Sequence, residues 1–189
     1  MKNIIPFSVV LGLAVIFTAC DPSEQFKEEL TEIDSLEVFV NDFEAKYESI
    51  EFDSLKLMVE EVEQNERDIK FYYTPDTINE ELGKNMLESK SIRKKLKGSE
   101  SKKMVFGDEL NAIKHQLINL RADIEAGLLT AEEIRRYIDE ESAALRAFEI
   151  SFLEFYEIQL FEKQIYYTYV PKVNEFIESI KPEEGSVIE

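Results

Sequence analysis

A seven-residue spacing of apolar and small residues between Ile78 and Ile124 constrains the fold of this chain more than any other feature. Such a spacing places its members along one side of an α-helix, as in a coiled coil. The second half of the stretch is regular, whereas the middle is weakened near Gly98. We therefore expect one long helix over 77–126, and the alternative is two helices with a break between Gly98 and Gly107.

The clearest helix-start signal comes immediately after this stretch. Thr130 and Glu133 have the spacing of a capping box, in which each residue bonds the other's backbone N–H. Gly127 stands where a left-handed residue would end the preceding helix. These signals predict a tight helical hairpin with its tip at 127–130 and a final helix over 131–180.

Start signals upstream predict two further helices, over 22–51 and 53–72. With only 6 Gly and 5 Pro in the chain, the sequence predicts an all-α fold. We expect an antiparallel helical bundle with a long helical hairpin that forms a coiled-coil-like arm. The helical domain is expected over 20–181, followed by a disordered tail over 182–189.

Short connections usually join antiparallel neighbours. On that rule we expect a four-helix bundle at one end of the molecule and a two-helix arm at the other. The aromatic-rich second half of the last helix, around Phe152, would then lie in the bundle. The N-terminus would also lie there, with the hairpin tip pointing away from it.

The first residues of the chain have the features of a secretory signal, here assigned to 1–19. Lys2 is followed by an apolar run that is shorter than the roughly twenty residues needed to cross a bilayer. The end of the run, Phe17-Thr18-Ala19-Cys20, resembles a bacterial lipobox, although leucine is usual in place of Phe17. The resemblance implies a lipoprotein of the bacterial cell envelope. Cys20 would carry a covalent diacylglycerol and acyl lipid, and the outer membrane is favoured over the inner one.

Charge argues against a nucleic-acid partner. With 40 acidic and 22 basic residues the chain carries a formal charge of −18, which repels phosphate backbones. The balance reverses between Lys84 and Lys103, where basic residues predominate. Two interpretations stand. The residues order the helices through acidic neighbours, or they contact an anionic surface, for which the candidates are Lys90, Arg93, Lys94, Lys95 and Lys97.

The side chains that usually carry catalysis or bind metal are scarce. His115 is the sole histidine, which excludes a four-helix di-iron site and a zinc site with two or three histidines. Cys20 is the sole cysteine, and lipidation would consume it. No glycine motif of a nucleophile elbow accompanies a serine. We therefore expect no catalytic residue, no metal and no cofactor beyond the lipid on Cys20.

These expectations favour a lipid-anchored, non-enzymatic helical scaffold or protein-interaction module. Leu128 and Leu129 at the hairpin tip are candidate contacts for a protein partner, and self-association stays open. One alternative is a periplasmic chaperone-like or stress-related binder, because 129–133 resembles the Leu-Thr-x-x-Gln motif of small periplasmic chaperones. Another is a binder of lipid or a hydrophobic ligand among the aromatic side chains.

Overall fold

The protein is an all-α rod in the computed structural model, which describes residues 22–74 and 79–182. The helices are α1 (Pro22–Gln25), α2 (Lys27–Glu48), α3 (Phe52–Tyr72), α4 (Glu80–Leu96), α5 (Ser99–Glu125) and α6 (Ala131–Ile180). No strand occurs within the described ranges. The predicted signal, Cys20 and most of the predicted tail lie outside these ranges.

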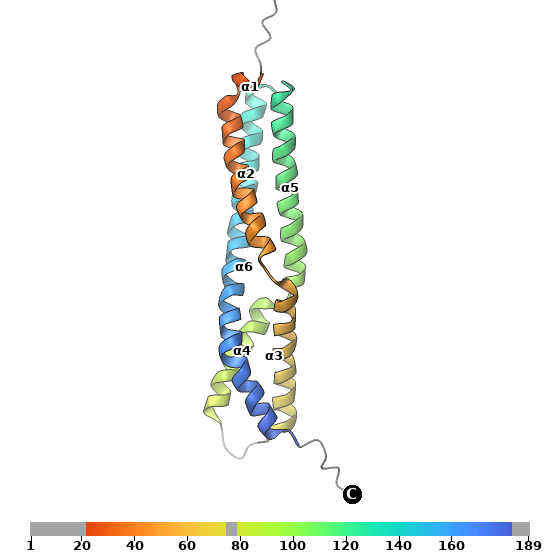
Figure 1. Ribbon diagram of the computed structural model, residues 1–189, viewed down its shortest axis with the longest axis vertical. Helices are drawn as coiled ribbons and strands as arrows, with labels where there is room; N and C mark the ends of the chain where they lie inside the picture. The colour runs from red at the N-terminus through yellow and green to blue at the C-terminus, as the bar shows by residue number, and fades with distance from the viewer. Residues whose placement is uncertain (1–21, 75–78, 183–189) are drawn as a thin grey trace, which may run out of the picture.

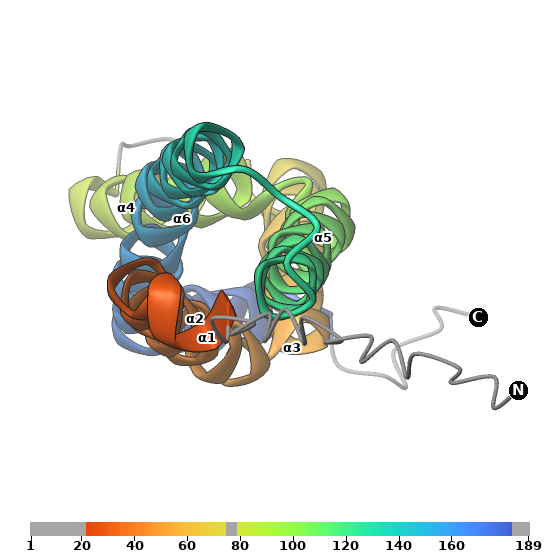
Figure 2. The same cartoon turned by 90° about the horizontal axis from the view of Figure 1, so that it is seen from above.

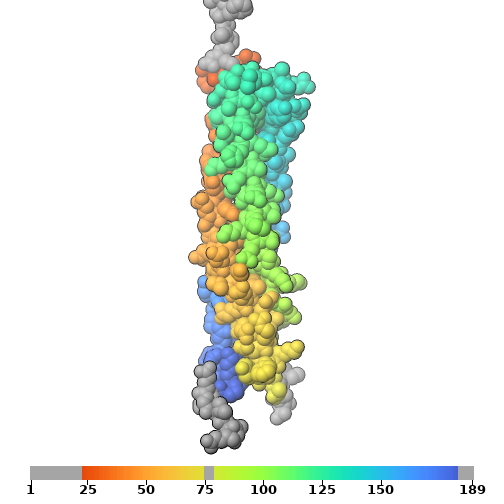
Figure 3. All heavy atoms as spheres, turned by 90° about the vertical axis from the view of Figure 1, so that its right-hand side faces the viewer, coloured from red at the N-terminus to blue at the C-terminus, as the bar shows by residue number. Residues whose placement is uncertain are grey.

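In one half of the rod α2, α5 and α6 pack against one another, and in the other half α3, α4 and α6 do so; Figures 1 and 2 show these helices side by side. α6 runs the full length. α2 and α3 follow one another along it in the same direction, and α4 and α5 return (Figure 1). We call α2, α5 and the first half of α6 the tip half, and α3, α4 and the second half of α6 the far half. Figure 3 shows the narrow outline, with α5 above the yellow end of α3.

The expected antiparallel bundle with a long hairpin is confirmed, but the expected four-helix end and two-helix arm are wrong. α2 and α3 do not fold back on each other. The chain only interrupts its helix at Ser49–Glu51, and Ile50 and Phe52 are both buried there. Because both sides of this break point into the core, α2 and α3 keep their apolar stripes on the same partner, α6.

The expectation of one continuous helix over 77–126 is also wrong, and the alternative with a break holds. α4 ends at Leu96, and Gly98 takes a left-handed φ of 88° before α5 begins. The start of α4 differs from the prediction as well. Its N-cap is Asn79, whose side chain accepts a hydrogen bond from the Leu82 N–H at 3.0 Å.

The hairpin tip has the local structure that the sequence predicts. Gly127 has a φ of 65°, and the N–H groups of Gly127 and Leu128 donate to the carbonyls of Ile124 and Asp123. This pair of bonds is a Schellman motif. Thr130 and Glu133 form the capping box. α6 then continues for 50 residues and passes through Pro171 without ending.

The N-terminal end of the described chain lies at the hairpin tip, opposite to the expected polarity. α1 packs on α5, and both lie at the same end of the rod as the tip (Figure 1). Ion pairs hold α2 against the hairpin close to this end, between Arg135 and Glu32 at 2.8 Å and between Arg121 and Glu37 at 2.9 Å. The α5–α6 hairpin is therefore covered by α2 up to its tip.

A paired distance measurement tests this polarity. In a Cys20→Ser background, spin labels at Glu24→Cys and Leu128→Cys should lie close together. Labels at Glu24→Cys and Phe71→Cys should lie on the order of 65 Å apart. About 45 residues lie between the start of α2 and the end of α3, and each helical residue adds 1.5 Å along the rod. Double electron–electron resonance measures both pairs. A long first distance with a short second one would restore the antiparallel arrangement of α2 and α3.

Two glycines of the α4 region should respond to alanine in opposite directions. Gly98→Ala forces a Cβ into a left-handed conformation and should lower the free energy of unfolding by about 1–2 kcal/mol. Gly83 lies within α4, and a Cβ added there would meet open space. Gly83→Ala should therefore raise the free energy of unfolding by roughly 0.5–1 kcal/mol. Urea unfolding followed by circular dichroism measures both. Equal effects of the two substitutions would contradict the break at Gly98.

Candidate functional site

The five basic residues from Lys90 to Lys97, four in α4 and Lys97 at its C-cap, separate into two groups that the sequence alone does not distinguish. Arg93 and Lys95 hold the bundle together. The Arg93 guanidinium lies 3.3 Å from Glu66 of α3, and Lys95 Nζ lies 2.8 Å from Glu162 Oε1 of α6. Lys95 Nζ also lies 5.4 Å from the centre of the Phe161 ring. For these two residues, the interpretation that basic side chains order the helices is the one that the contacts support.

Lys90, Lys94 and Lys97 form the second group, which faces solvent. Leu87, Lys90 and Lys94 recur every three or four residues, so they share one side of α4, and Lys97 at the C-cap lines the same surface groove. We call these four residues the basic face of α4. Its three lysines are exposed and make no ion pair with any residue in the described ranges. A surface groove of about 470 Å³ runs along this face.

A buried polar layer lies behind the basic face, between α4 and α6. Glu162 is fully buried, and its Oε2 accepts a hydrogen bond from the Ser91 hydroxyl at 2.6 Å. Its Oε1 pairs with Lys95, whose side chain is still 45% exposed. The negative charge of Glu162 is therefore compensated by the Lys95 ammonium group, which lies at the edge of the bundle. This layer fixes how α4 sits on α6, because a shift of either helix would leave the carboxylate without its partners.

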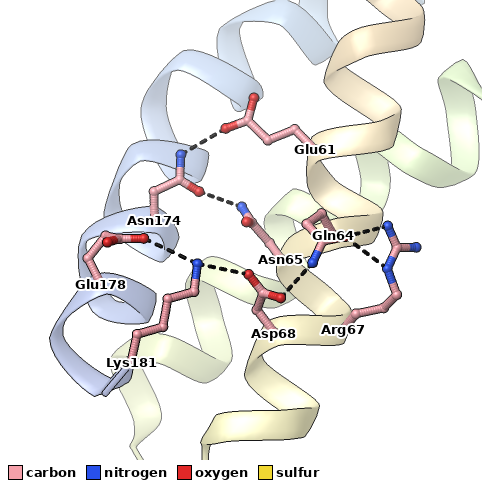
Figure 4. A network of polar contacts seen from close by, with 8 residues as sticks. All are labelled: Glu61, Gln64, Asn65, Arg67, Asp68, Asn174, Glu178 and Lys181. Atoms are coloured by element: carbon pink, nitrogen blue, oxygen red, sulfur yellow. Dashed lines mark hydrogen bonds and ion pairs between the residues drawn. The ribbon is translucent and has the colours of Figure 1, made fainter. Parts of the chain in front are cut away.

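A second polar network joins α3 to the C-terminal end of α6 (Figure 4). Asn174 donates to Glu61 Oε1 at 2.8 Å and accepts from Asn65 at 2.6 Å. The Tyr166 hydroxyl donates to the other oxygen of Glu61. Burial, and then this hydrogen bond, raise the pKa of Tyr166 above its ordinary value, so the hydroxyl stays a donor.

A separate ion-pair bridge lies beside this network, at the C-cap of α6. Lys181 Nζ lies 3.2 Å from Asp68 of α3 and 3.3 Å from Glu178 (Figure 4). The residues of this network were not predicted from the sequence, although one signal was present. Asn65 follows Val62 by three residues and so continues the buried stripe of α3. A polar residue in such a stripe indicates a partner across the bundle.

The two leucines of the hairpin tip do not act as a pair. Leu129 is partly buried and packs against the hydrophobic core, whereas Leu128 is 70% exposed. Leu129 is therefore explained by the fold, and Leu128 is the one that can contact a partner or a membrane. α1 packs on α5 at the same end of the rod (Figure 1).

The described ranges contain no group of three or more His, Cys, Asp or Glu residues arranged to hold a metal ion. His115 is exposed on α5. Within residues 22–74 and 79–182, no helix combines the length and the apolar character that a membrane span requires. No protein-family model matches the chain, and comparisons with curated proteins and with solved structures find no match. Fold and site thus define a class, an elongated all-α bundle with a basic face on one helix.

The Glu162–Lys95 pair should show the asymmetry of a buried charge. Lys95→Met removes the cation and leaves the carboxylate buried, which should cost about 2 kcal/mol of unfolding free energy. Glu162→Met replaces the buried carboxylate by an apolar side chain of similar volume and should cost less than about 1 kcal/mol. Denaturant unfolding compares the variants. If the double variant were less stable than Lys95→Met alone, this account of the pair would be wrong.

Proposed function

We propose that this protein is a lipid-anchored component of the bacterial cell envelope and acts as a non-enzymatic helical scaffold. The observation that carries the proposal is the place of α1 (Pro22–Gln25), which packs on α5 at one end of a rod. Cys20 of the lipobox-like sequence precedes Pro22 by two residues, and two residues of chain can span at most about 8 Å. A lipid on Cys20 would hold the rod by its end.

Because the anchor would be at one end, the rod would extend away from the membrane along its full length. α6 has 50 residues, which corresponds to about 75 Å at 1.5 Å per residue. The hairpin tip with exposed Leu128 would lie at the bilayer, and the far half would project from it. The basic face of α4 belongs to the projecting half, where a partner could reach it. An extended, end-anchored shape with a filled core is suited to spacing or presenting a binding surface.

The alternative functions gain less support from the contacts. A ligand binder needs room among the aromatic side chains, but these rings pack on one another. Phe152 lies 5.3 Å from Phe148 and 5.4 Å from Phe106, measured between ring centres. The chaperone-like motif at the tip is accounted for by helix capping, because Thr130 and Glu133 bond each other. We therefore favour the scaffold.

The anchor is tested by replacing the cysteine. The wild-type protein should partition with membranes, and mass spectrometry should find a diacylglyceryl group on an N-terminal Cys20. Cys20→Ser should abolish the acyl mass and leave the signal uncleaved. Phe17→Leu is the matched control. It brings the sequence closer to the lipobox pattern and should preserve or increase processing. Membrane-bound wild-type protein that carries no acyl group would contradict the proposal.

A further inference from the structure

The basic face of α4 is the strongest charged surface that the bundle itself does not use. Arg93 and Lys95 on the same helix are paired with Glu66 and Glu162, whereas Lys90, Lys94 and Lys97 have no such partner in the described part of the chain. The contacts with Glu66 and Glu162 therefore account for Arg93 and Lys95, but no contact of this kind accounts for Lys90, Lys94 and Lys97.

The lysines of this face repel one another. Lys90 and Lys94 are four residues apart, and Lys94 and Lys97 three, which are the spacings at which like charges on a helix repel. The chain has 40 acidic residues, so carboxylates to neutralise these lysines are not scarce. Surface charges are usually placed beside opposite charges. A cluster of lysines without acidic partners departs from that pattern, and such departures are expected at functional surfaces.

The groove beside the cluster indicates what kind of ligand it suits. It has a volume of about 470 Å³ and is lined by Leu87, Lys90, Ser91, Arg93, Lys94 and Lys97. Leu87 is 69% exposed beside these cations. From Leu87 to Lys97 the face extends about 15 Å along the helix, at 1.5 Å per residue. Charges spread along a line with one apolar contact suit a segment bearing several carboxylates, rather than a single small anion.

From this geometry we infer that the basic face of α4 binds an acidic amphipathic segment of a partner protein. Glutamate or aspartate side chains of the segment pair with Lys90, Lys94 and Lys97, and an apolar side chain covers Leu87. The inference rests on the proposed function, since it names the class of partner that the scaffold would hold. Complementary charge of this kind chiefly speeds association and selects the partner.

The bilayer that would hold the anchor is a poor occupant of this face. Lys95 of α4 contacts Glu162 of α6, which follows the start of α6 by about 30 residues. That separation places the basic face about 45 Å from the hairpin tip along the rod. Charges interact weakly beyond the Debye length, which is about 8 Å at physiological salt. In an end-anchored rod the lysines therefore lie out of reach of the anchoring membrane.

The test uses the full mature protein in neutral detergent and a fluorescent amphipathic peptide with glutamates on one face and a leucine between them. A scrambled peptide of the same composition is the second probe. Fluorescence anisotropy should show binding that weakens with salt and favours the amphipathic peptide. Lys90→Glu/Lys94→Glu should weaken it by about tenfold or more. Lys27→Glu/Lys70→Glu changes the net charge equally at exposed lysines outside the groove and should have less than about a twofold effect.

A third variant separates the apolar contact from the charges. Leu87→Gln should weaken binding severalfold at low and at high salt alike, because it removes no charge. Circular dichroism should show all variants as helical as the wild type. In Lys90→Glu/Lys94→Glu the loss of lysine repulsion and the new carboxylate in the last turn of α4 act in opposite directions, so the unfolding temperature should stay close to that of the wild type.

Several results would overturn the inference. Equal losses in both double variants would mean that only net charge matters. Binding to phosphatidylglycerol vesicles without binding to the peptide would assign the face to a lipid surface. A wild-type dimer that Lys90→Glu/Lys94→Glu dissociates in sedimentation would assign it to a second copy of this chain. Mass spectrometry of Cys20 in the same preparation tests the anchor separately, so failure of the anchor and failure of the acidic partner are distinguishable.

Discussion

The rod depends on a cluster of phenylalanine rings at its middle. Phe152 of α6 lies 5.9 Å from Phe43 of α2 and 5.4 Å from Phe106 of α5, and Phe155 stacks on Phe52 of α3 at 6.0 Å. Large rings in edge and stacked contacts bury much apolar surface and favour particular orientations. Because α2, α3, α5 and α6 all contribute a ring, the cluster joins the two halves at the level where α2 gives way to α3. That is why a helix break there does not divide the molecule.

The two halves joined by the cluster are stabilised differently. In the tip half, helix contacts are apolar inside and ion-paired at the edges, as between Arg121 and Glu37. In the far half, polar groups such as Asn65 and Glu162 enter the core. Buried polar groups add little net stability, but they fix register, since a displaced helix loses its partners. The far half thus holds α4 in one position, and this position keeps Lys90, Lys94 and Lys97 facing outward.

Local signals in the sequence identify several helix ends, but they miss the start of α4 at Asn79 and do not give the direction of the helices. Thr130 and Gly127 identify the hairpin because capping and a left-handed turn are properties of adjacent residues. The interruption at Ser49–Glu51 falls between the helices predicted over 22–51 and 53–72, but no local signal gives the direction of the second helix, which follows from the simultaneous burial of Ile50 and Phe52. The candidate site shows the same limit. Helical spacing can group the lysines of α4, but only tertiary contacts with Glu66 and Glu162 show which basic residues are already paired.

Reversing the expected polarity changes what the molecule can present to its surroundings. Had the N-terminus been at the other end of the rod, α4 would lie near the membrane and its lysines would face lipid headgroups. With α1 at the same end of the rod as the hairpin tip, the same lysines lie in the half that would project from the anchor. The chain has 40 acidic and 22 basic residues, so its net charge would repel an acidic partner. The basic face of α4 would then be an attractive region for an acidic segment.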